Sequence, residues 1–358
     1  LKHPGSGFVY SDCTVDDARL TILNAVDAAQ AGADIRTRTA LVSASRDTHH
    51  WTISLSDGSA ATARTLVNAG GPWLIDVERR MGLPARNSIR LVKGSHIVVP
   101  QLFEGTHAYM LQQADRRIVF AIPWVGGTTM VGTTEETVPS PESPAISEEE
   151  TQYLLNAANQ AFVRQTARED IRYDWAGVRP LFDDGADDAR TTTRDYVLEV
   201  DAGGALLLNV LGGKITTARY LAEDAMGRLG KAAGRPAQHV TRGRPFPGGA
   251  LPGSFDAFVE TVRTRWPFLG DARSERMARA YGADITQMLG GIEGVLAMGE
   301  DFGHGLTRIE VDWMIDREWA RSTDDILWRR SKLGLAFDEA RRGKLDDYVR
   351  GRVDAARH

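Results

Sequence analysis

The sequence is poor in cysteine and has no long apolar run. Its 358 residues include one cysteine, Cys13, which excludes an intramolecular disulfide and supplies too few ligands for a structural zinc site. This usage favours a reducing compartment, and we expect Cys13 to be a small buried residue. No apolar run approaches the roughly 20 residues that span a bilayer, so we predict no transmembrane helix. We also expect no metal site.

Positive charge is not in excess either. Lys and Arg total 43 against 48 Asp and Glu, which gives a net charge of −5 at neutral pH. This balance argues against a general electrostatic attraction to nucleic acid or to an anionic membrane. The sequence starts at Leu1 without a signal-peptide pattern, so we expect it to be the interior of a longer protein.

Capping and turn residues predict several elements in the first part of the chain. Thr14, followed by an acidic first turn, predicts the start of a helix that ends near Gly32. An Asp57-Gly58 turn between alternating apolar runs predicts a β-hairpin. Residues 65–69 have the pattern of a short buried strand that ends in a glycine turn.

The rest of the chain contains two further capping patterns and one segment rich in proline and glycine. Ser147 with Glu150, and Thr307 with Glu310, each have the spacing of a helix capping box. Lys231 to Ser254 holds four prolines and five glycines, which makes it the best domain boundary in the sequence. The chain after this boundary has the pattern of helices to its end.

Two glycine motifs follow strand patterns. Gly70 and Gly71 end the first strand, where glycine lets another group approach the backbone, although a simple turn explains them equally well. Gly212 to Thr217 places two glycines, Lys214 and two hydroxyls at a helix start, whose free N–H groups attract an anion or an electron-rich ring. An ordinary strand-to-helix turn with a solvated lysine explains this second motif about as well.

Three polar segments stand where apolar residues would be expected: Lys93 to His96, Gly177 to Pro180, and Thr193 to Tyr196. The planar guanidinium groups of Arg179 and Arg194 suit a phosphate or carboxylate, and His96 can exchange a proton near neutral pH. Each residue alone is explained by a surface cation or by a histidine at the edge of the core. Taken together with Lys214, they predict a pocket for a small anionic substrate.

These motifs occur in an order that resembles the FAD-dependent glycerol-3-phosphate dehydrogenase family. The matching segments run over nearly the whole chain: residues 10–20, 68–73, 93–100, 117–120, 132–134, 153–156, 177–181, 193–198, 212–217, 299–304 and 318–334. The helical C-terminal part favours the respiratory, quinone-linked dehydrogenase over the more distant flavin oxidases.

The resemblance implies a mixed α/β fold of the D-amino acid oxidase type, with a Rossmann-like FAD-binding domain that is incomplete at its N-terminus. The implied domains are a partial FAD-binding domain at 1–87, a substrate domain with an antiparallel sheet at 88–180, a return to the FAD-binding domain at 181–235, a linker at 236–253, and a C-terminal helical domain at 254–358. The strand, Gly-rich turn and helix that receive the FAD pyrophosphate in the family are expected to precede Leu1, since no G-x-G-x-x-G follows a strand in this chain.

The resemblance also implies a reaction and its residues. Members oxidise sn-glycerol 3-phosphate to dihydroxyacetone phosphate and pass the electrons through FAD to a membrane quinone. By motif, Arg179, Arg194 and Lys214 would hold the substrate, and His96 would take the hydroxyl proton, with Lys214 as the other candidate. The residues expected along the flavin are Gly70, Gly71, Gly212, Gly213, Thr216 and Thr217.

Partners and location follow from the same resemblance. The family implies a cytoplasmic protein with peripheral contact to the inner face of the membrane, and a homodimer is compatible with it. Local support for the membrane is restricted to Trp328, Arg329, Arg330 and Lys332, which a packed helix face explains better. Two alternatives remain: a glycerol-3-phosphate oxidase that uses oxygen, and a non-catalytic truncated interaction module.

Overall fold

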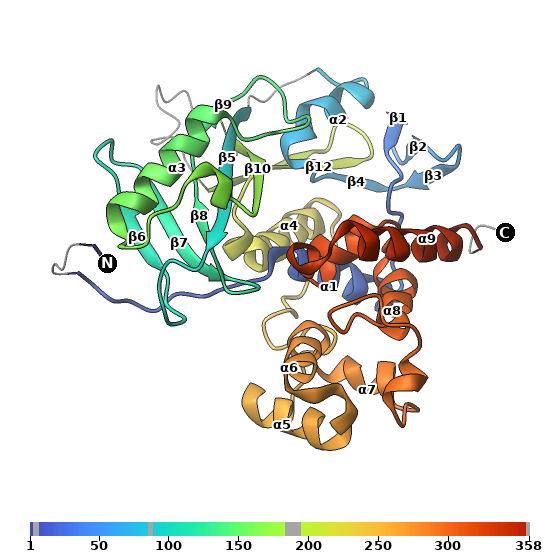
Figure 1. The fold of residues 1–358 in the computed structure, drawn as a ribbon. Coiled ribbons are helices and arrows are strands. Elements are labelled where there is room, and N and C mark those ends of the chain that lie inside the picture. Colours follow the sequence, from blue (N-terminus) through green and yellow to red (C-terminus); the bar gives the residue numbers. More distant parts are fainter. Residues whose placement is uncertain (3–6, 85–88, 183–194, 356–358) are drawn as a thin grey trace. The chain divides into compact units, whose positions relative to one another are not determined.

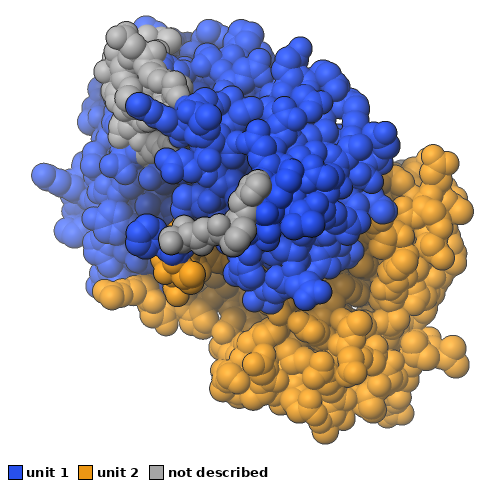
Figure 2. Space-filling model, turned by 60° about the vertical axis from the view of Figure 1, so that its left-hand side comes forward, with its two compact units in different colours: residues 1–8, 38–241 blue, residues 9–37, 242–358 orange. Residues whose placement is uncertain are grey.

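The computed structural model describes residues 1–2, 7–84, 89–182 and 195–355. These residues form two compact units, coloured separately in Figure 2. The first unit consists of residues 1–8 and 38–241, and the second consists of residues 9–37 and 242–358.

Two three-stranded sheets lie in the first unit. The first is an antiparallel meander in the order β1-β2-β3, and the predicted hairpin at Asp57-Gly58 is confirmed, with Gly58 at a φ of 82°. The second has the order β11-β12-β4, in which β12 runs parallel to β4. Their strands are β1 (Leu41–Arg46), β2 (Trp51–Leu55), β3 (Ala60–Ala63), β4 (Thr65–Asn68), β11 (Tyr196–Asp201) and β12 (Leu206–Gly212).

Apolar side chains hold these sheets in layers. Helix α4 (Ala218–Ala232) packs Ala225 and Leu229 against Leu198 and Leu208 of the β11-β12-β4 sheet. A separate cluster joins this sheet to the β1-β2-β3 sheet and to helix α2 (Leu74–Arg80) through Ala44, Trp51, Met81, Ala205 and Leu207. The result is the mixed α/β layering that the sequence predicts.

The largest sheet of the first unit carries the residues of most interest. It has the order β10-β5-β8-β7-β6, with β9 also paired to β5, and all its pairs are antiparallel (Figure 1). Its strands are β5 (Ile89–Pro100), β6 (Tyr109–Gln112), β7 (Ile118–Trp124), β8 (Thr128–Gly132), β9 (Glu136–Thr137) and β10 (Tyr173–Phe182). The predicted antiparallel sheet is therefore present.

Helix α3 (Glu148–Ala161) covers one face of this sheet (Figure 1). Ile97 and Val99 of β5 belong to the same buried cluster as Leu154 and Phe162 on the helix side. Ser147 caps the helix, and its predicted capping box with Glu150 is confirmed. Because side chains alternate along a strand, every second residue of β5 must point to the opposite face.

The second unit is built from helices, as predicted for the C-terminal part. Its α-helices are α1 (Asp17–Gln30), α5 (Phe255–Arg265), α6 (Gly270–Tyr281), α7 (Ile285–Leu289), α8 (Arg308–Glu318) and α9 (Glu339–Ala355). Shorter helical turns in the two units are η1 (Gly71–Trp73), η2 (Arg168–Asp170), η3 (Ile215–Thr217), η4 (Pro267–Leu269), η5 (Gly282–Asp284), η6 (Val295–Met298), η7 (Asp325–Arg330) and η8 (Gly334–Ala336). Within the described ranges, every helix is too short or too polar to cross a membrane.

Helix α1 is grouped differently from the expected division, which placed it in residues 1–87. It belongs to the helical unit, because Arg19 forms a buried ion pair with Glu318 of α8 at 2.7 Å. The second nitrogen of the Arg19 guanidinium donates to the carbonyl of Ala280 at 2.8 Å. A buried charge of this kind is stable only with its partner, so it fixes α1 to the helices at the other end of the chain.

Two local expectations at this helix are wrong. The N-cap is Asp16 and not Thr14, since the Asp16 carboxylate accepts from the backbone N–H of Arg19 at 3.1 Å. Cys13 is exposed and not buried, because it lies in the extended segment that precedes the helix.

The predicted capping box of α8 is also wrong. Thr307 is the N-cap, but its side chain makes no capping hydrogen bond. Glu310 is fully buried and accepts from Arg276 at 2.5 and 2.8 Å and from the Tyr281 hydroxyl at 2.9 Å. The Glu310 carboxylate is therefore engaged in a long-range ion pair and does not form the capping box.

Basic residues near residue 330 form hydrogen bonds and ion pairs within the helical unit. Arg330 donates to the carbonyl of Glu318, and its side chain is 9% exposed. Lys332 forms an ion pair with Asp16 at 3.3 Å. These contacts agree with a packed helix face and weaken the cluster as an argument for membrane contact.

Candidate functional site

His96 and Arg179 lie on one face of the six-stranded sheet, opposite to α3. In the register of β5 and β10, His96 pairs with Trp175, and Arg179 follows Trp175 by four residues on the same strand. Residues that pair directly, and residues an even number apart, share a face of a sheet. The fold thus brings together two of the residues that the sequence singles out as the proton acceptor and the anion-binding cation.

The His96 imidazole is held between a tryptophan and a glycine. Its ring stacks on Trp175, with the ring centroids 5.0 Å apart and the planes within 9° of parallel. On the other side, His96 pairs with Gly132 of β8, and a Cβ at Gly132 would lie 2.2 Å from Cδ2 of His96. Glycine is required there because the ring occupies the place of any side chain.

The Arg179 guanidinium crosses the strand over Gly94. One Nη donates to the Thr133 hydroxyl at 3.2 Å, and the other lies 3.9 Å from a carboxylate oxygen of Glu135. A Cβ at Gly94 would lie 2.8 Å from that first Nη, so glycine makes room for the guanidinium. The side chain remains 41% exposed, which leaves the cation accessible to an anion from solvent.

A buried polar network supports this site from the other face of the sheet. The Ser95 and Thr134 hydroxyls donate to one carboxylate oxygen of Glu150, at 2.9 and 2.5 Å. The Lys93 ammonium lies 3.0 Å from the other oxygen of Glu150 and 2.8 Å from Glu136. Since Ser95 precedes His96 and Thr134 follows Thr133, the network holds the two backbone segments that carry the site.

The network also sets the ionisation of Glu150. Burial by itself would raise the pKa of this carboxyl, but the hydrogen bonds from Thr134, the Ser147 N–H and Lys93 outweigh burial and lower the pKa. A carboxyl with a lowered pKa stabilises the fold above its ordinary pKa and loses that contribution as the pH falls. Part of the decrease in the free energy of unfolding at acidic pH is therefore the loss of this contribution from Glu150.

We expect Glu150→Gln to lower the free energy of unfolding by about 2 to 3 kcal/mol at pH 7, because one amide cannot accept all these hydrogen bonds. The difference from wild type should narrow as the pH falls below about 4.3, the ordinary glutamate pKa, because the unfolded wild-type chain then gains a proton that the native carboxyl, with its lowered pKa, does not yet bind. Urea unfolding followed by tryptophan fluorescence measures both effects. The exposed neighbour Glu149 provides the control, since Glu149→Gln should change stability by less than about 0.5 kcal/mol. Equal effects of the two substitutions would contradict the role of the network.

The Gly212-Gly213 motif lies beside strand β10. Gly212 has a φ of 68° and Gly213 a φ of 101°, and a Cβ at Gly212 would lie 2.9 Å from the carbonyl of Asp195 and 3.8 Å from that of Pro180. The chain then turns through η3, with Lys214 exposed, and enters α4 at Thr217. No side chain caps the start of α4, but η3 uses two of the N–H groups there, since those of Thr217 and Ala218 donate to the carbonyls of Lys214 and Ile215.

The Gly70-Gly71 motif ends β4. The Asn68 side chain accepts from the Gly70 N–H at 3.2 Å and donates to the carbonyl of Leu74 at 3.1 Å, which fixes the turn. Gly71 has a φ of 54°, and a Cβ there would meet no described atom within 4 Å. This turn contacts β10 and β12, so it lies near the Gly212 motif in the same unit.

The structure therefore groups most of the predicted site residues around β10, with Thr216 and Thr217 at the start of α4. Arg194 lies outside the described residues. Sequence reasoning missed Trp175, Thr133 and Glu150. The even spacing of Trp175 from Arg179 on one strand is a signal that could have identified Trp175 as a neighbour of the site.

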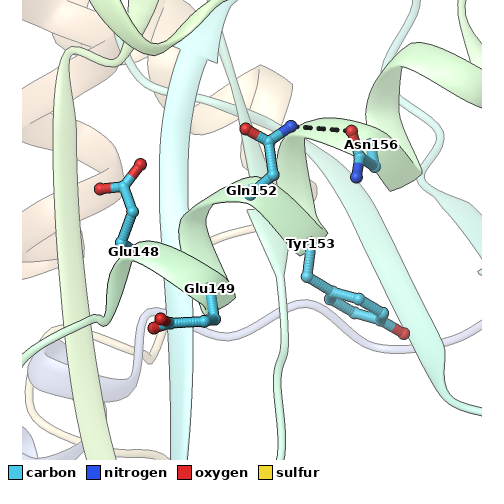
Figure 3. A pocket seen from close by; sticks show the side chains of 5 residues that line it. All are labelled: Glu148, Glu149, Gln152, Tyr153 and Asn156. Atoms are coloured by element: carbon cyan, nitrogen blue, oxygen red, sulfur yellow. Dashed lines mark hydrogen bonds between the residues drawn. The ribbon is translucent and has the colours of Figure 1, made fainter.

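A surface depression of about 450 Å³ lies elsewhere, along the outer side of α3 (Figure 3). It is lined by Glu148, Glu149, Gln152, Tyr153 and Asn156. Its two carboxylates would repel an anionic substrate, and it includes none of the predicted site residues. In the described part of the chain, no group of three or more His, Cys, Asp or Glu residues could hold a metal ion.

Comparison with known proteins places these residues in a family context. A family model described as "FAD dependent oxidoreductase" matches residues 2–219. A glycerol-3-phosphate dehydrogenase of Pseudomonas aeruginosa is 46% identical, over 98% of this chain and 71% of that protein. The aerobic glycerol-3-phosphate dehydrogenase of Escherichia coli is 41% identical, over 96% of this chain and 70% of that protein.

Two further similarities bear on substrate and fold. The D-erythritol 1-phosphate dehydrogenase of Brucella abortus is 41% identical, over 96% of this chain and 70% of that protein. The solved structure of a glycerol-3-phosphate dehydrogenase from Bacillus halodurans complexed with FAD superposes with a TM-score of 0.73 at 22% identity, covering 94% of this chain and 72% of that one. At this level of identity the superposition shows the fold, which agrees with the expected FAD-binding architecture and helical C-terminal region.

Proposed function

Because this chain belongs to the FAD-dependent glycerol-3-phosphate dehydrogenase family, we propose that it oxidises sn-glycerol 3-phosphate to dihydroxyacetone phosphate and passes the electrons to a quinone. The observation that carries this proposal is the pairing, on one face of one sheet, of a solvent-accessible cation and a histidine. Arg179 is 41% exposed, and His96 lies on the neighbouring strand.

The phosphate is the part of the substrate that Arg179 recognises. A planar guanidinium gives a phosphate dianion charge-assisted hydrogen bonds that a neutral polyol cannot match. Lys214 is exposed and carries the second positive charge that we assign to the substrate, and Arg194 is assigned by its motif alone. Specificity for the phosphorylated polyol follows from these charges.

His96 takes the proton of the substrate's C2 hydroxyl in this proposal. The stack on Trp175 and the close approach to Gly132 fix the plane of the ring, so the imidazole is held in one orientation for proton transfer. As the O–H proton moves to His96, the C2–O bond becomes a carbonyl and the C2 hydrogen leaves with its electron pair. Lys214 is the other candidate for the proton acceptor.

The residues beside β10 fit the ring end of FAD. Gly70, Gly71, Gly212 and Gly213 offer bare backbone, and Thr216 and Thr217 bring two hydroxyls to the uncapped start of α4, where the positive end of the helix dipole favours electron-rich ring oxygens. When bound, FAD supplies the acceptor for the hydride that leaves C2. Electron transfer to a membrane quinone would require peripheral contact with the cytoplasmic face of the membrane. The proposal therefore includes a cytoplasmic protein in peripheral contact with the membrane, and it also includes a homodimer.

An anaerobic reduction experiment tests the function. The FAD-loaded protein is mixed with glycerol 3-phosphate in the absence of oxygen, and we expect the visible absorbance of the bound flavin to bleach. A water-soluble ubiquinone analogue should then restore the absorbance faster than oxygen does, without hydrogen peroxide. Rapid reoxidation by oxygen with peroxide release would instead identify an oxidase.

Two other outcomes would contradict the proposed substrate. Faster bleaching by D-erythritol 1-phosphate than by glycerol 3-phosphate would assign the chain to the activity named for its Brucella relative. Retained flavin that neither substrate bleaches would favour the non-catalytic interaction module.

A further inference from the structure

We propose that Thr133 is a positioning residue for substrate binding, because its hydroxyl fixes the direction of the Arg179 guanidinium. This inference rests on the proposed function, in which Arg179 binds the substrate phosphate. It adds a residue that acts through Arg179 and not through a contact of its own with the substrate. The contact that carries it is the hydrogen bond from one Nη of Arg179 to the Thr133 hydroxyl oxygen, at 3.2 Å.

The hydroxyl hydrogen of Thr133 is already used in this arrangement. Thr133 Oγ1 donates it to the carbonyl oxygen of Thr134, which lies 3.1 Å away. A hydroxyl has one hydrogen to donate and two lone pairs that accept. Since the hydrogen is directed at that carbonyl, the lone pairs are left for a donor, and Arg179 supplies the donor. Thr133 is therefore an acceptor of fixed direction for the guanidinium.

The neighbouring Thr134 anchors this hydroxyl to the buried side of the sheet. Thr134 is 1% exposed. Its Oγ1 accepts from the Ser95 N–H at 2.9 Å and donates to a Glu150 oxygen at 2.5 Å. These buried hydrogen bonds restrain Thr134, and through the chain they restrain Thr133. The acceptor for Arg179 is thus held by the same network that holds the two strands.

Gly94 makes room for both polar groups. A Cβ at Gly94 would lie 2.5 Å from Thr133 Oγ1 and 2.8 Å from the Arg179 Nη that donates to it. The two groups therefore meet directly over the β5 backbone. A long side chain that is 41% exposed loses rotamer freedom when a ligand holds it. An Arg179 that Thr133 has already oriented loses less, so the hydroxyl should increase the affinity for an anion.

Removal of the hydroxyl at constant shape tests this role. Thr133→Val keeps the branched side chain without the acceptor, and it should raise the Kd of inorganic phosphate for the holoenzyme about 3- to 10-fold. Thr133→Ser keeps the hydroxyl, so its Kd should stay within about twofold of wild type. Isothermal titration calorimetry with inorganic phosphate measures these constants without turnover.

Thr128 on β8 provides the matched control. Its half-buried side chain donates to the carbonyl of Val125 at 2.8 Å, and it lies at the other end of the strand from Gly132. Thr128→Val therefore removes a comparable hydrogen bond without a change at Arg179. Its Kd for phosphate should equal that of wild type.

A double-mutant cycle shows whether the effect passes through Arg179. In Thr133→Val, kcat/KM for glycerol 3-phosphate, measured by anaerobic flavin bleaching, should fall about 3- to 10-fold, mainly as a higher KM. In an Arg179→Ala background, the same substitution should change kcat/KM by less than about twofold, because the side chain that Thr133 orients is absent.

A wild-type phosphate Kd in Thr133→Val overturns the inference. A loss that Thr133→Ser shares, or one that persists in the Arg179→Ala background, overturns it too, and so does failure of both Thr133 variants to fold. Arg179→Ala separates these results from a failure of the proposed function. If this variant binds phosphate like wild type, the proposed phosphate site is wrong and the inference falls with it. If it binds weakly while Thr133→Val is unaffected, the inference alone is wrong.

Discussion

His96→Asn is expected to lower kcat for glycerol 3-phosphate by about 10²- to 10⁴-fold, the range over which a positioned general base accelerates proton transfer. Asparagine keeps a polar group of similar size next to Trp175 and Gly132 but cannot accept the hydroxyl proton. The KM should change little, because the phosphate contact at Arg179 remains. Anaerobic stopped-flow measurement of flavin bleaching reports the affected step directly.

His107 supplies a matched control for this substitution. It is an exposed histidine whose ring contacts Phe103 and Tyr109. His107→Asn should bleach the flavin at the wild-type rate. If His96→Asn did so too, the proton would have another acceptor, and Lys214 would be the next residue to replace.

Arg179→Ala is expected to lower kcat/KM for glycerol 3-phosphate by about 10²- to 10³-fold, because truncating one partner of a buried or half-buried charge pair costs about 3 to 4 kcal/mol. The loss should be specific to the phosphorylated substrate. We expect the wild type and the variant to oxidise unphosphorylated glycerol slowly and at the same rate, so the ratio of the two activities measures the phosphate contribution. Arg179→Lys should recover part of the loss, since it restores the charge without the planar fork.

Arg168 is the control for this prediction. It forms an exposed ion pair with Glu148, with both side chains more than 60% exposed, and such pairs contribute little to stability. Arg168→Ala should leave both activities unchanged. An unchanged preference for the phosphorylated substrate in Arg179→Ala would remove this arginine from the phosphate site.

The two faces of the six-stranded sheet have different roles in this proposal. One face presents His96 and Arg179 over bare glycine backbone, and the other anchors the same strands through Glu150 and the core beneath α3. His96 and Arg179, the two proposed substrate residues on this sheet, therefore lie on strands rather than on a loop, which limits their movement. A site of this kind loses activity when either face is disturbed, but only the Glu150 face should show the loss as a change in stability.

Local signals in the sequence were sufficient for much of the fold. The Asp57-Gly58 hairpin and the Ser147–Glu150 capping box form as predicted, because each depends on residues that are close together along the chain. Local sequence patterns also predicted the motif around Arg179 and the helices of about the last hundred residues. Periodicity, capping and turn chemistry act over a few residues, so they can be identified in a sequence.

Tertiary contacts decided the rest. Arg19 and Glu318 are 299 residues apart, and their ion pair assigns α1 to the helical unit. Glu310 has a capping-box spacing in the sequence but binds Arg276 and Tyr281 instead. The stack of His96 on Trp175 likewise depends on the register of two strands, and the sequence does not encode register locally. The sequence by itself determined which elements form and which motifs they carry, whereas long-range pairing of charges and strands determined which side chains meet.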